Sequence, residues 1–164
     1  MLILDASAVR AALPMGEAVE LMKAAFAALA RGEATVPTRA RLAAPDDAGV
    51  TLVMSARVDG VAPSLAVKVV SVFDANPAAG LARIQAAVIV LDPDTGRPRA
   101  LLEGAALTAI RTAAASGAAT DLLARPDATT LAVLGAGVQA HAHVEAMCVV
   151  RPITDVRIYG PTPA

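Results

Sequence analysis

The sequence contains few aromatic residues: one Tyr, two Phe and no Trp in 164 residues. Proteins that bind single-stranded nucleic acid stack the bases on aromatic side chains, and this chain has almost none to offer. The formal net charge is −1, so no excess of basic residues is present to attract phosphates. Both observations argue against nucleic acid as a partner.

Cysteine and long apolar runs are also scarce. The single cysteine, Cys148, has no second cysteine to pair with, which fits a reducing cytosol, and we expect it to be a small buried apolar residue. Charged residues interrupt every apolar run before about 18 residues, so we expect no membrane-spanning helix. The start, Met1–Asp5, lacks a basic segment and a long apolar core, so we expect no signal peptide and a cytoplasmic location.

Hydrophobic residues make up 56% of the chain, and many of them are alanine. This composition favours close packing of helices over a core of bulky side chains. Helical spacing of apolar residues predicts a covering helix over Gly16–Arg31, with Val19, Met22, Phe26 and Leu29 on its inner face. A second, alanine-rich helix is predicted over Gly104–Ala124, and Arg125-Pro126-Asp127 ends it.

The region between these two helices is rich in strands. Ser7 is a candidate cap for a brief early helix after a first strand at Leu2–Asp5. Alternation and turn signals predict further strands at Val36–Ala43, Val50–Val58, Leu65–Phe73, Ala86–Leu91 and Arg99–Leu102. We therefore predict an α/β fold with a sheet-rich N-terminal domain, residues 1–124, followed by an incomplete Rossmann (βαβ) nucleotide-binding domain, residues 125–164.

The main functional signal is a glycine-rich turn between an apolar run ending at Leu134 and a helical pattern. Gly135 permits a tight turn, Gly137 lets the backbone approach a pyrophosphate, and Ala140, in the third place of the motif, is small enough for close packing of helix on strand. Free N–H groups at the following helix start face the phosphates. An ordinary βα turn is the alternative, but a second strand, Asp155–Tyr159, follows at βαβ spacing and favours dinucleotide binding. The residues predicted to contact the cofactor here are Gly135, Ala136, Gly137, Val138 and Gln139.

Several cations lie in apolar surroundings. Lys68 interrupts an apolar strand, so it either charges an exposed sheet edge or faces a cavity where it meets a ligand carboxylate. Arg111 is the only charged residue between Glu103 and Asp121, and arginine suits fork-like recognition of a carboxylate or phosphate. Arg39 is a third candidate, although spacing alone cannot separate it from Arg41, on the same face of the strand. We expect Lys23, in contrast, to be a solvated charge on an exposed helical face.

Together these cations and the glycine turn indicate an anionic small substrate beside a nicotinamide cofactor. No metal-ligating cluster is evident, because His141 and His143 lie two apart on a helix and diverge. No arrangement of Ser, His and Asp suggests a nucleophile.

The chain resembles the ornithine cyclodeaminase/mu-crystallin family over essentially its whole length. The segments around Lys68 and Arg111 together form a specific signature, whereas the glycine turn alone does not. The matching stretches are Val36-Pro37-Thr38-Arg39, residues 67–73 with Asn76-Pro77, residues 91–96, 100–104 and 107–115, and the turn at Gly135–Gln139.

This resemblance implies an N-terminal domain that binds substrate and forms a homodimer, and a Rossmann domain that binds NAD. In ornithine cyclodeaminase, NAD takes a hydride from the α-carbon to give an imine; the side-chain amine attacks, ammonia leaves, and return of the hydride yields proline. Residue by residue, the resemblance implies that Arg39 binds the substrate carboxylate, Lys68 contacts substrate, and Arg111 touches substrate and cofactor. Val138 and Gln139 would lie on the pyrophosphate side of NAD.

Three departures from the family pattern stand out. Ala82-Arg83 replace a Pro-Thr pair whose threonine contacts the cofactor. Neither an acid nor an arginine follows the second Rossmann strand, which reads Tyr159-Gly160-Pro161-Thr162, so the sequence does not distinguish NAD from NADP. The family also continues well beyond this length, and its catalytic Asp, the general acid/base, lies in that further part. The sequence therefore looks like the first half of a family member, whose last strand would leave an unpaired edge.

Three functions remain open at this point. The first is an NAD(P)-dependent protein like ornithine cyclodeaminase, acting on a small amino acid. The second is a ketimine or pyrroline-carboxylate reductase, or an amino-acid dehydrogenase, of the same family. The third is a truncated, non-catalytic protein that dimerises or binds ligands. In each case we expect the 164-residue chain alone to show no turnover.

Overall fold

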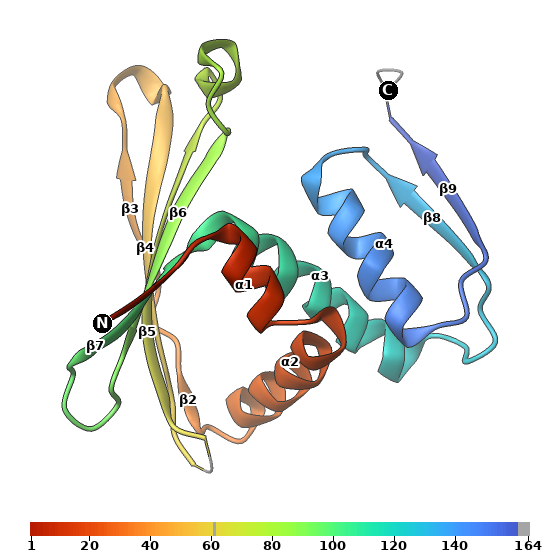
Figure 1. The fold of residues 1–164 in the computed structure, drawn as a ribbon, viewed down its shortest axis with the longest axis horizontal. Helices are drawn as coiled ribbons and strands as arrows, with labels where there is room; N and C mark the ends of the chain where they lie inside the picture. The colour runs from red at the N-terminus through yellow and green to blue at the C-terminus, as the bar shows by residue number, and fades with distance from the viewer. Residues whose placement is uncertain (61, 161–164) are drawn as a thin grey trace. The chain divides into compact units, whose positions relative to one another are not determined.

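A computed structural model describes residues 1–60 and 62–160 of the chain. The chain divides into two compact units: residues 1–9 with 27–107, and residues 10–26 with the part from 108 onward. Figure 1 labels the helices α1 (Ala6–Ala12), α2 (Met15–Ala30) and α3 (Gly104–Leu123). Each of them contributes residues to both units.

The first unit is built on a seven-stranded sheet. Its strands are ordered β1-β7-β6-β5-β4-β2, and β3 also pairs with β4. All neighbours are antiparallel except β1 and β7, which run parallel. The strands are β1 (Leu2–Leu4), β2 (Ala34–Thr35), β3 (Ala40–Ala43), β4 (Gly49–Val58), β5 (Ser64–Phe73), β6 (Ile84–Leu91) and β7 (Pro98–Glu103), with short 3-10 turns at Pro45–Asp47 and Asn76–Ala79.

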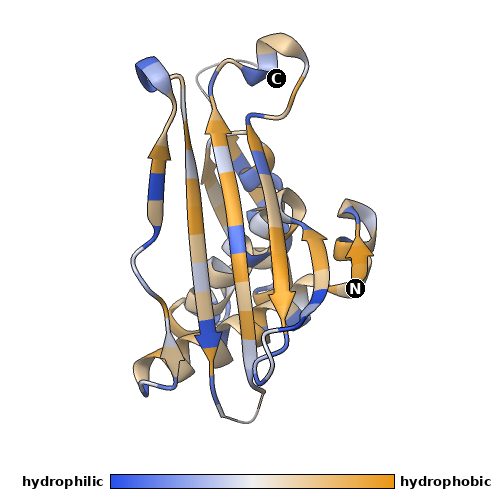
Figure 2. Cartoon of the chain, turned by 90° about the vertical axis from the view of Figure 1, so that its left-hand side faces the viewer, coloured by the Kyte–Doolittle hydropathy of each residue, from blue (hydrophilic) through white to orange (hydrophobic). Residues whose placement is uncertain are grey.

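The two faces of this sheet differ in burial. Val70 and Val88 are buried on one face, where the start of α3 also packs, because a Cβ on Gly104 would lie 2.7 Å from Ala86. The opposite face carries Val69 and Ile89, each 37% exposed although apolar. Figure 2 views the sheet with its strands towards the reader and shows long apolar stretches along them.

The structure corrects three local predictions in this unit. The single strand predicted over Val36–Ala43 is two strands, β2 and β3, and the gap between them contains Pro37, which has no N–H for a sheet ladder. Asp5, not Ser7, caps α1: its carboxylate accepts the Ala8 N–H at 2.8 Å and also the Ser7 hydroxyl at 2.7 Å. Strand β6 begins at Ile84, earlier than the predicted Ala86.

The second unit packs helices against a small parallel sheet. Strands β8 (Thr130–Leu134) and β9 (Asp155–Tyr159) pair in register on either side of α4 (Val138–Val150) in the chain, as the βαβ prediction requires. Alanines fill the helix contacts: Ala113, Ala114 and Ala146 are completely buried. Gly117 of α3 is equally tight, because a Cβ there would lie 2.9 Å from Val19 and 3.4 Å from Ala146. The alanine-rich composition therefore produces close helix packing, as predicted.

The stripe predicted for α2 is only half correct. Val19 is almost fully buried, but Phe26 and Leu29 are about half exposed. Among the described residues, no helix is both long enough and apolar enough to span a bilayer.

Candidate functional site

The glycine turn joins β8 to α4 and has the geometry that its sequence predicts. Gly135 has a φ of +112°, a conformation that side-chain-bearing residues rarely adopt, and its N–H donates to the Tyr159 carbonyl at 2.7 Å. Gly137 has extended backbone and stands at the N-cap of α4. A Cβ at Gly137 would meet no atom within 4 Å, so the backbone here opens onto unfilled space.

The start of α4 has no side-chain cap. Gly137 supplies no side-chain oxygen, and the Ala140 and His141 N–H groups donate to the Gly137 carbonyl at 2.9 and 3.4 Å. The first N–H groups of a helix have no partner within the helix, and together with the helix dipole they favour an anion. The turn can therefore receive a phosphate group of a dinucleotide.

A hollow of about 370 Å³ adjoins this turn and follows β8. Gly135, Gly137 and Gln139 line it, together with His143 and Met147 further along α4. The Gln139 Oε1 atom is buried and, among the described residues, accepts no hydrogen bond. An orphaned acceptor of this kind is uncommon in native interiors and marks a place where a donor belongs.

His143 holds this part of the site in place. Its Nδ1 lies 2.6 Å from the Gln139 carbonyl oxygen, so Nδ1 carries the proton, and Nε2 lies 3.1 Å from the Ser116 hydroxyl of α3. The imidazole thus ties the first turn of α4 to α3. Sequence reasoning considered His143 only as a metal ligand, and nothing in the sequence pairs it with Ser116, 27 residues away.

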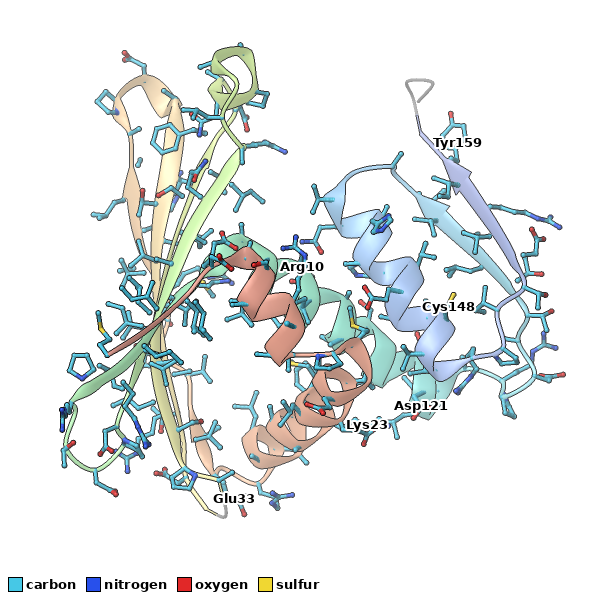
Figure 3. All side chains as sticks on the ribbon, in the orientation of Figure 1. Arg10, Lys23, Glu33, Asp121, Cys148 and Tyr159 are labelled. Atoms are coloured by element: carbon cyan, nitrogen blue, oxygen red, sulfur yellow. The ribbon has the colours of Figure 1, made fainter. Side chains whose placement is uncertain are left out.

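The two histidines diverge, as expected. His143 lines the hollow beside β8, whereas His141 lines a second hollow of about 430 Å³ between α4 and β9. No group of three or more metal-ligating side chains occurs in residues 1–60 and 62–160. Cys148, which we expected to be buried, is exposed near the end of α4 (Figure 3).

The three predicted substrate-binding cations are distributed over both units. Lys68 and Arg39 belong to the first unit and Arg111 to the second. Lys68 is half-buried on β5, between β4 and β6, so the interpretation of a lysine on a sheet edge is wrong. Its cross-strand neighbours are Met54 and Val88.

Arg39 and Arg111 are exposed. Arg39 lies just before β3, whereas Arg41 lies within it, so of these two arginines Arg41 alone is part of a strand. The shared site for Lys68 and Arg111 beside Gly135 stays a prediction.

A cluster around Arg151 closes the far end of α3. The side chain is only 7% exposed, and its Nη1 lies 2.7 Å from Asp121 Oδ1. The same guanidinium donates to the carbonyls of Thr120, Asp121, Ala124 and Arg125 at 2.8–2.9 Å. Lys23 completes the cluster, with its ammonium 2.6 Å from Asp121 Oδ2 and 2.7 Å from Glu20 (Figure 3).

Lys23 is therefore not the solvated charge that its position in the sequence predicts. Hydrogen bonds from Lys23 and then Arg151 lower the pKa of Asp121 below its usual value of 3.8. The hydrogen bond from Asp121, followed by that from Glu20, raises the pKa of Lys23. This cluster holds together the helices that support the site, and we assign it no role in binding a ligand.

Two of the positions at which the sequence departs from the family pattern are Arg83 and the segment after the second Rossmann strand. Arg83 is exposed and pairs with Asp74 at 2.7 Å across the loop before β6. Tyr159 is the last residue of β9 and Gly160 follows it, whereas Pro161 and Thr162 lie outside the described residues.

Comparison with known proteins identifies the family of this chain. The model of the ornithine cyclodeaminase/mu-crystallin family matches residues 1–164. A Delta(1)-pyrroline-2-carboxylate reductase of Bacillus cereus is 36% identical over 162 residues, which is 99% of this chain and 50% of that protein. The chain therefore spans about half the length of the curated relatives it matches.

Solved structures give the same result. The Thermococcus litoralis Delta(1)-pyrroline-2-carboxylate reductase, in complex with NADH and L-proline, superposes with a TM-score of 0.90 at 40% identity, covering 99% of this chain and 50% of that one. An archaeal alanine dehydrogenase dimer with bound NAD gives 0.90 at 32% identity, covering 98% and 48%. Their fold confirms the prediction of an α/β protein with the start of a nucleotide-binding domain.

Proposed function

Because this chain belongs to the ornithine cyclodeaminase/mu-crystallin family, we propose that it forms the substrate-binding half, and the start of the nucleotide site, of an NAD-dependent enzyme. Its substrate is a small amino acid or the corresponding cyclic imine. The observation that carries this proposal is the turn at Gly135–Gln139, which has an uncapped helix start and an open approach to the Gly137 backbone. The division at residues 124/125 into a substrate domain and a nucleotide domain is part of the proposal.

NAD is the cofactor we propose, in line with the NADH and NAD complexes of the two solved relatives. Gly135, Ala136 and Gly137 would hold the pyrophosphate through backbone N–H groups, with Val138 and Gln139 beside it. The open space at Gly137 and the orphaned Gln139 oxygen support this fit. When bound, NAD supplies a hydride acceptor or, in its reduced form, a hydride donor.

Arg39, Lys68 and Arg111 are the groups we propose for the substrate. Two arginines and a lysine match the carboxylate that every amino acid and imino acid carries. Lys68 is half-buried, so its charge is better shielded from water than those of the exposed arginines. Arg111 would touch both substrate and cofactor.

Reduction of a cyclic imine is the reaction we favour, because the relatives described above at 36% and 40% identity are both pyrroline-2-carboxylate reductases. A hydride adds to the imine carbon, a proton adds to the nitrogen, and the product is a cyclic amino acid such as proline. The role of the chain is to fix the carboxylate and orient the carbon toward the hydride. The second candidate is the cyclodeaminase reaction, favoured by the match to the family model.

We further propose that the chain forms a homodimer in the cytoplasm. The uncovered face of the sheet carries a row of apolar side chains that are direct cross-strand neighbours, Ile3, Leu101, Ile89 and Val67. Ile3 is 69% exposed, which supports a partner surface here. A chain with one cysteine is typical of a reducing compartment.

A chimaera tests the proposed reaction. This chain replaces the matched half of the Bacillus cereus reductase in one polypeptide, and the product is assayed with NADH and pyrroline-2-carboxylate. The proposal expects oxidation of NADH and formation of proline, both reduced at least about tenfold by Lys68→Met. Proline formed from ornithine without net change in NADH would instead support the cyclodeaminase reaction. A folded chimaera that does neither contradicts the proposal.

A further inference from the structure

Helices α3 and α4 contact each other at three levels within the second unit. At the far end of α4, the Arg151 guanidinium donates to carbonyl groups at the end of α3. In the middle, a Cβ on Gly117 of α3 would lie 3.4 Å from the Cβ of Ala146. On the side of the glycine turn, the His143 Nε2 lies 3.1 Å from the Ser116 hydroxyl oxygen. The contacts follow the same order along both helices, so α4 is tied to α3 at both of its ends.

The imidazole of His143 has a defined arrangement of protons. A carbonyl oxygen can only accept a hydrogen bond, so Nδ1, which lies 2.6 Å from the Gln139 carbonyl oxygen, carries a proton. In the neutral ring Nε2 is then an acceptor, and the Ser116 hydroxyl donates to it. Helical side chains lean toward the helix N-terminus, which explains why His143 reaches a carbonyl four residues earlier. The ring therefore links the backbone of the first turn of α4 to α3.

The first turn of α4 has a particular need for this support. The N-cap residue of many helices holds the first turn through a side-chain oxygen, whereas Gly137 makes no such bond. In the proposed nucleotide site a phosphate group takes the place of the missing cap. Before a nucleotide binds, the turn must be held by other contacts. The bond from His143 to the Gln139 carbonyl acts on this same turn.

The part of α3 that carries Ser116 is tightly packed. Ala113 and Ala114, just before Ser116, are completely buried. Gly117, just after it, has no room for a side chain, because a Cβ there would lie 2.9 Å from Val19. Closely packed interiors allow little movement of the backbone. The Ser116 hydroxyl is therefore a fixed point from which the imidazole ring can be held.

We propose that His143, held by Ser116, is a positioning residue of the nucleotide site. It keeps the first turn of α4 in the conformation that receives a phosphate before the nucleotide binds. The two side chains act through the Gln139 carbonyl and need no contact with the nucleotide. Hydrogen bonds behind a site hold the groups that touch the ligand, so their loss weakens binding. This inference rests on the proposed function, since it requires that the turn after β8 binds NAD.

Hydrogen exchange of the purified chain tests the support of the turn without nucleotide. Ser116→Ala removes the hydroxyl and hardly changes the volume of the side chain. The amides of Ala140 and His141 donate to the Gly137 carbonyl in the first turn. We expect both amides to exchange at least about threefold faster in the variant. The Arg151 amide, which donates to a carbonyl at the other end of α4, should exchange as in the wild type.

The chimaera with the Bacillus cereus reductase tests the effect on the nucleotide. Ser116→Ala and His143→Asn, whose side chain is too short to reach Ser116, should each raise the Kd for NADH about three- to tenfold. The KM for pyrroline-2-carboxylate should stay within about twofold of the wild-type value. The double variant should bind NADH no more weakly than His143→Asn alone, because both changes remove the same bond. His141→Asn is the matched control, since His141 is exposed, and it should leave the affinity for NADH unchanged.

Four results would overturn the positioning role. The first is unchanged exchange at Ala140 and His141 in Ser116→Ala, and the second is equal affinity of this variant and the wild-type chimaera for NADH. The third is an equal loss of affinity for NADH and for the imine, which a general loosening of the fold would cause. The fourth is a neutral His143 ring protonated at Nε2 in a nitrogen NMR spectrum. A wild-type chimaera that binds no NADH would instead contradict the proposed function itself.

Discussion

Arg151 places its guanidinium 2.7 Å from the carboxylate of Asp121, and the same guanidinium caps the last carbonyls of α3. Arg151 is the first residue after α4, and it supplies hydrogen-bond donors to the carbonyl groups at the end of α3. In the chain, β8 and α4 lie between that helix end and Arg151. Helix ends leave carbonyl groups without partners, and a cation there also interacts favourably with the helix dipole. This one side chain therefore joins the segment β8–α4–β9 to α3.

Loss of Arg151 should destabilise the chain strongly. Arg151→Met keeps the apolar stem but removes the ion pair and the hydrogen bonds to five carbonyls, so we expect a loss of about 3 kcal/mol of unfolding free energy. Urea denaturation measures it. The matched control is Arg125→Met, whose side chain is 82% exposed and pairs weakly, at 3.9 Å from Asp127. An equal effect of both variants would contradict the capping role.

The same cluster predicts a pH dependence. Lys23 and Arg151 lower the pKa of Asp121 in the folded chain, so the carboxylate stabilises the fold above the unfolded value of about 3.8. This stabilisation is lost as the pH falls through the folded pKa. Asp121→Asn should therefore be less stable than the wild type near neutral pH, and the gap should narrow in acid. Urea midpoints across the acid range measure it, and a gap independent of pH would refute the assignment.

Close packing at Gly117 gives a third prediction. Gly117→Val forces carbon atoms against Val19 and Ala146, and we expect it to destabilise by about 1–3 kcal/mol. Gly16→Ala is the contrasting change, since its Cβ would lie 3.8 Å from Val149 in ordinary contact. Alanine favours a helix over glycine, so this variant should gain up to about 1 kcal/mol. Equal changes in the thermal midpoint for Gly117→Val and Gly16→Ala would contradict the close packing around Gly117.

The proposed dimer face can be tested by charge. Ile89→Glu puts a carboxylate at the centre of the apolar row, and it should raise the dimer dissociation constant at least about tenfold. Ser64→Glu changes an exposed residue on the opposite face of the neighbouring strand and should leave association unchanged. Analytical ultracentrifugation measures the dimer dissociation constant of both variants. A monomeric wild type, or a dimer indifferent to Ile89→Glu, would exclude this face.

Local signals predicted most elements of the fold, although the strand predicted over Val36–Ala43 is two strands. The glycines of the turn, the β-branched run before them and the helical spacing after them correctly predicted the unit β8–α4–β9. The apolar run around Lys68 predicted a strand, and the alanines before Leu123 predicted α3. Each of these predictions depends on neighbours in sequence, where periodicity and turn chemistry are informative.

Apart from the local corrections at Pro37, Asp5 and the start of β6, the errors concern contacts between residues far apart in sequence or faces whose exposure depends on packing. Lys23 meets Asp121 across 98 residues, so its pattern on α2 could not reveal the ion pair. Phe26 and Cys148 have apolar character but lie on faces that the described residues leave exposed. Lys68 could not be placed on a central strand until the order of the sheet was known. The link between His143 and Ser116 needed the packing of α4 on α3.

The affinity of the chimaera for NADH tests the central claim, that the turn after β8 holds a dinucleotide. A Cβ at Gly137 would meet no protein atom, so Gly137→Ala should cost less than about 1 kcal/mol of stability. It would nevertheless obstruct a pyrophosphate that approaches the backbone. We predict that a fluorescence titration finds NADH bound at least about tenfold more weakly by Gly137→Ala, with a thermal midpoint lowered by at most a few degrees. Equal affinities for NADH in the two proteins would contradict the claim.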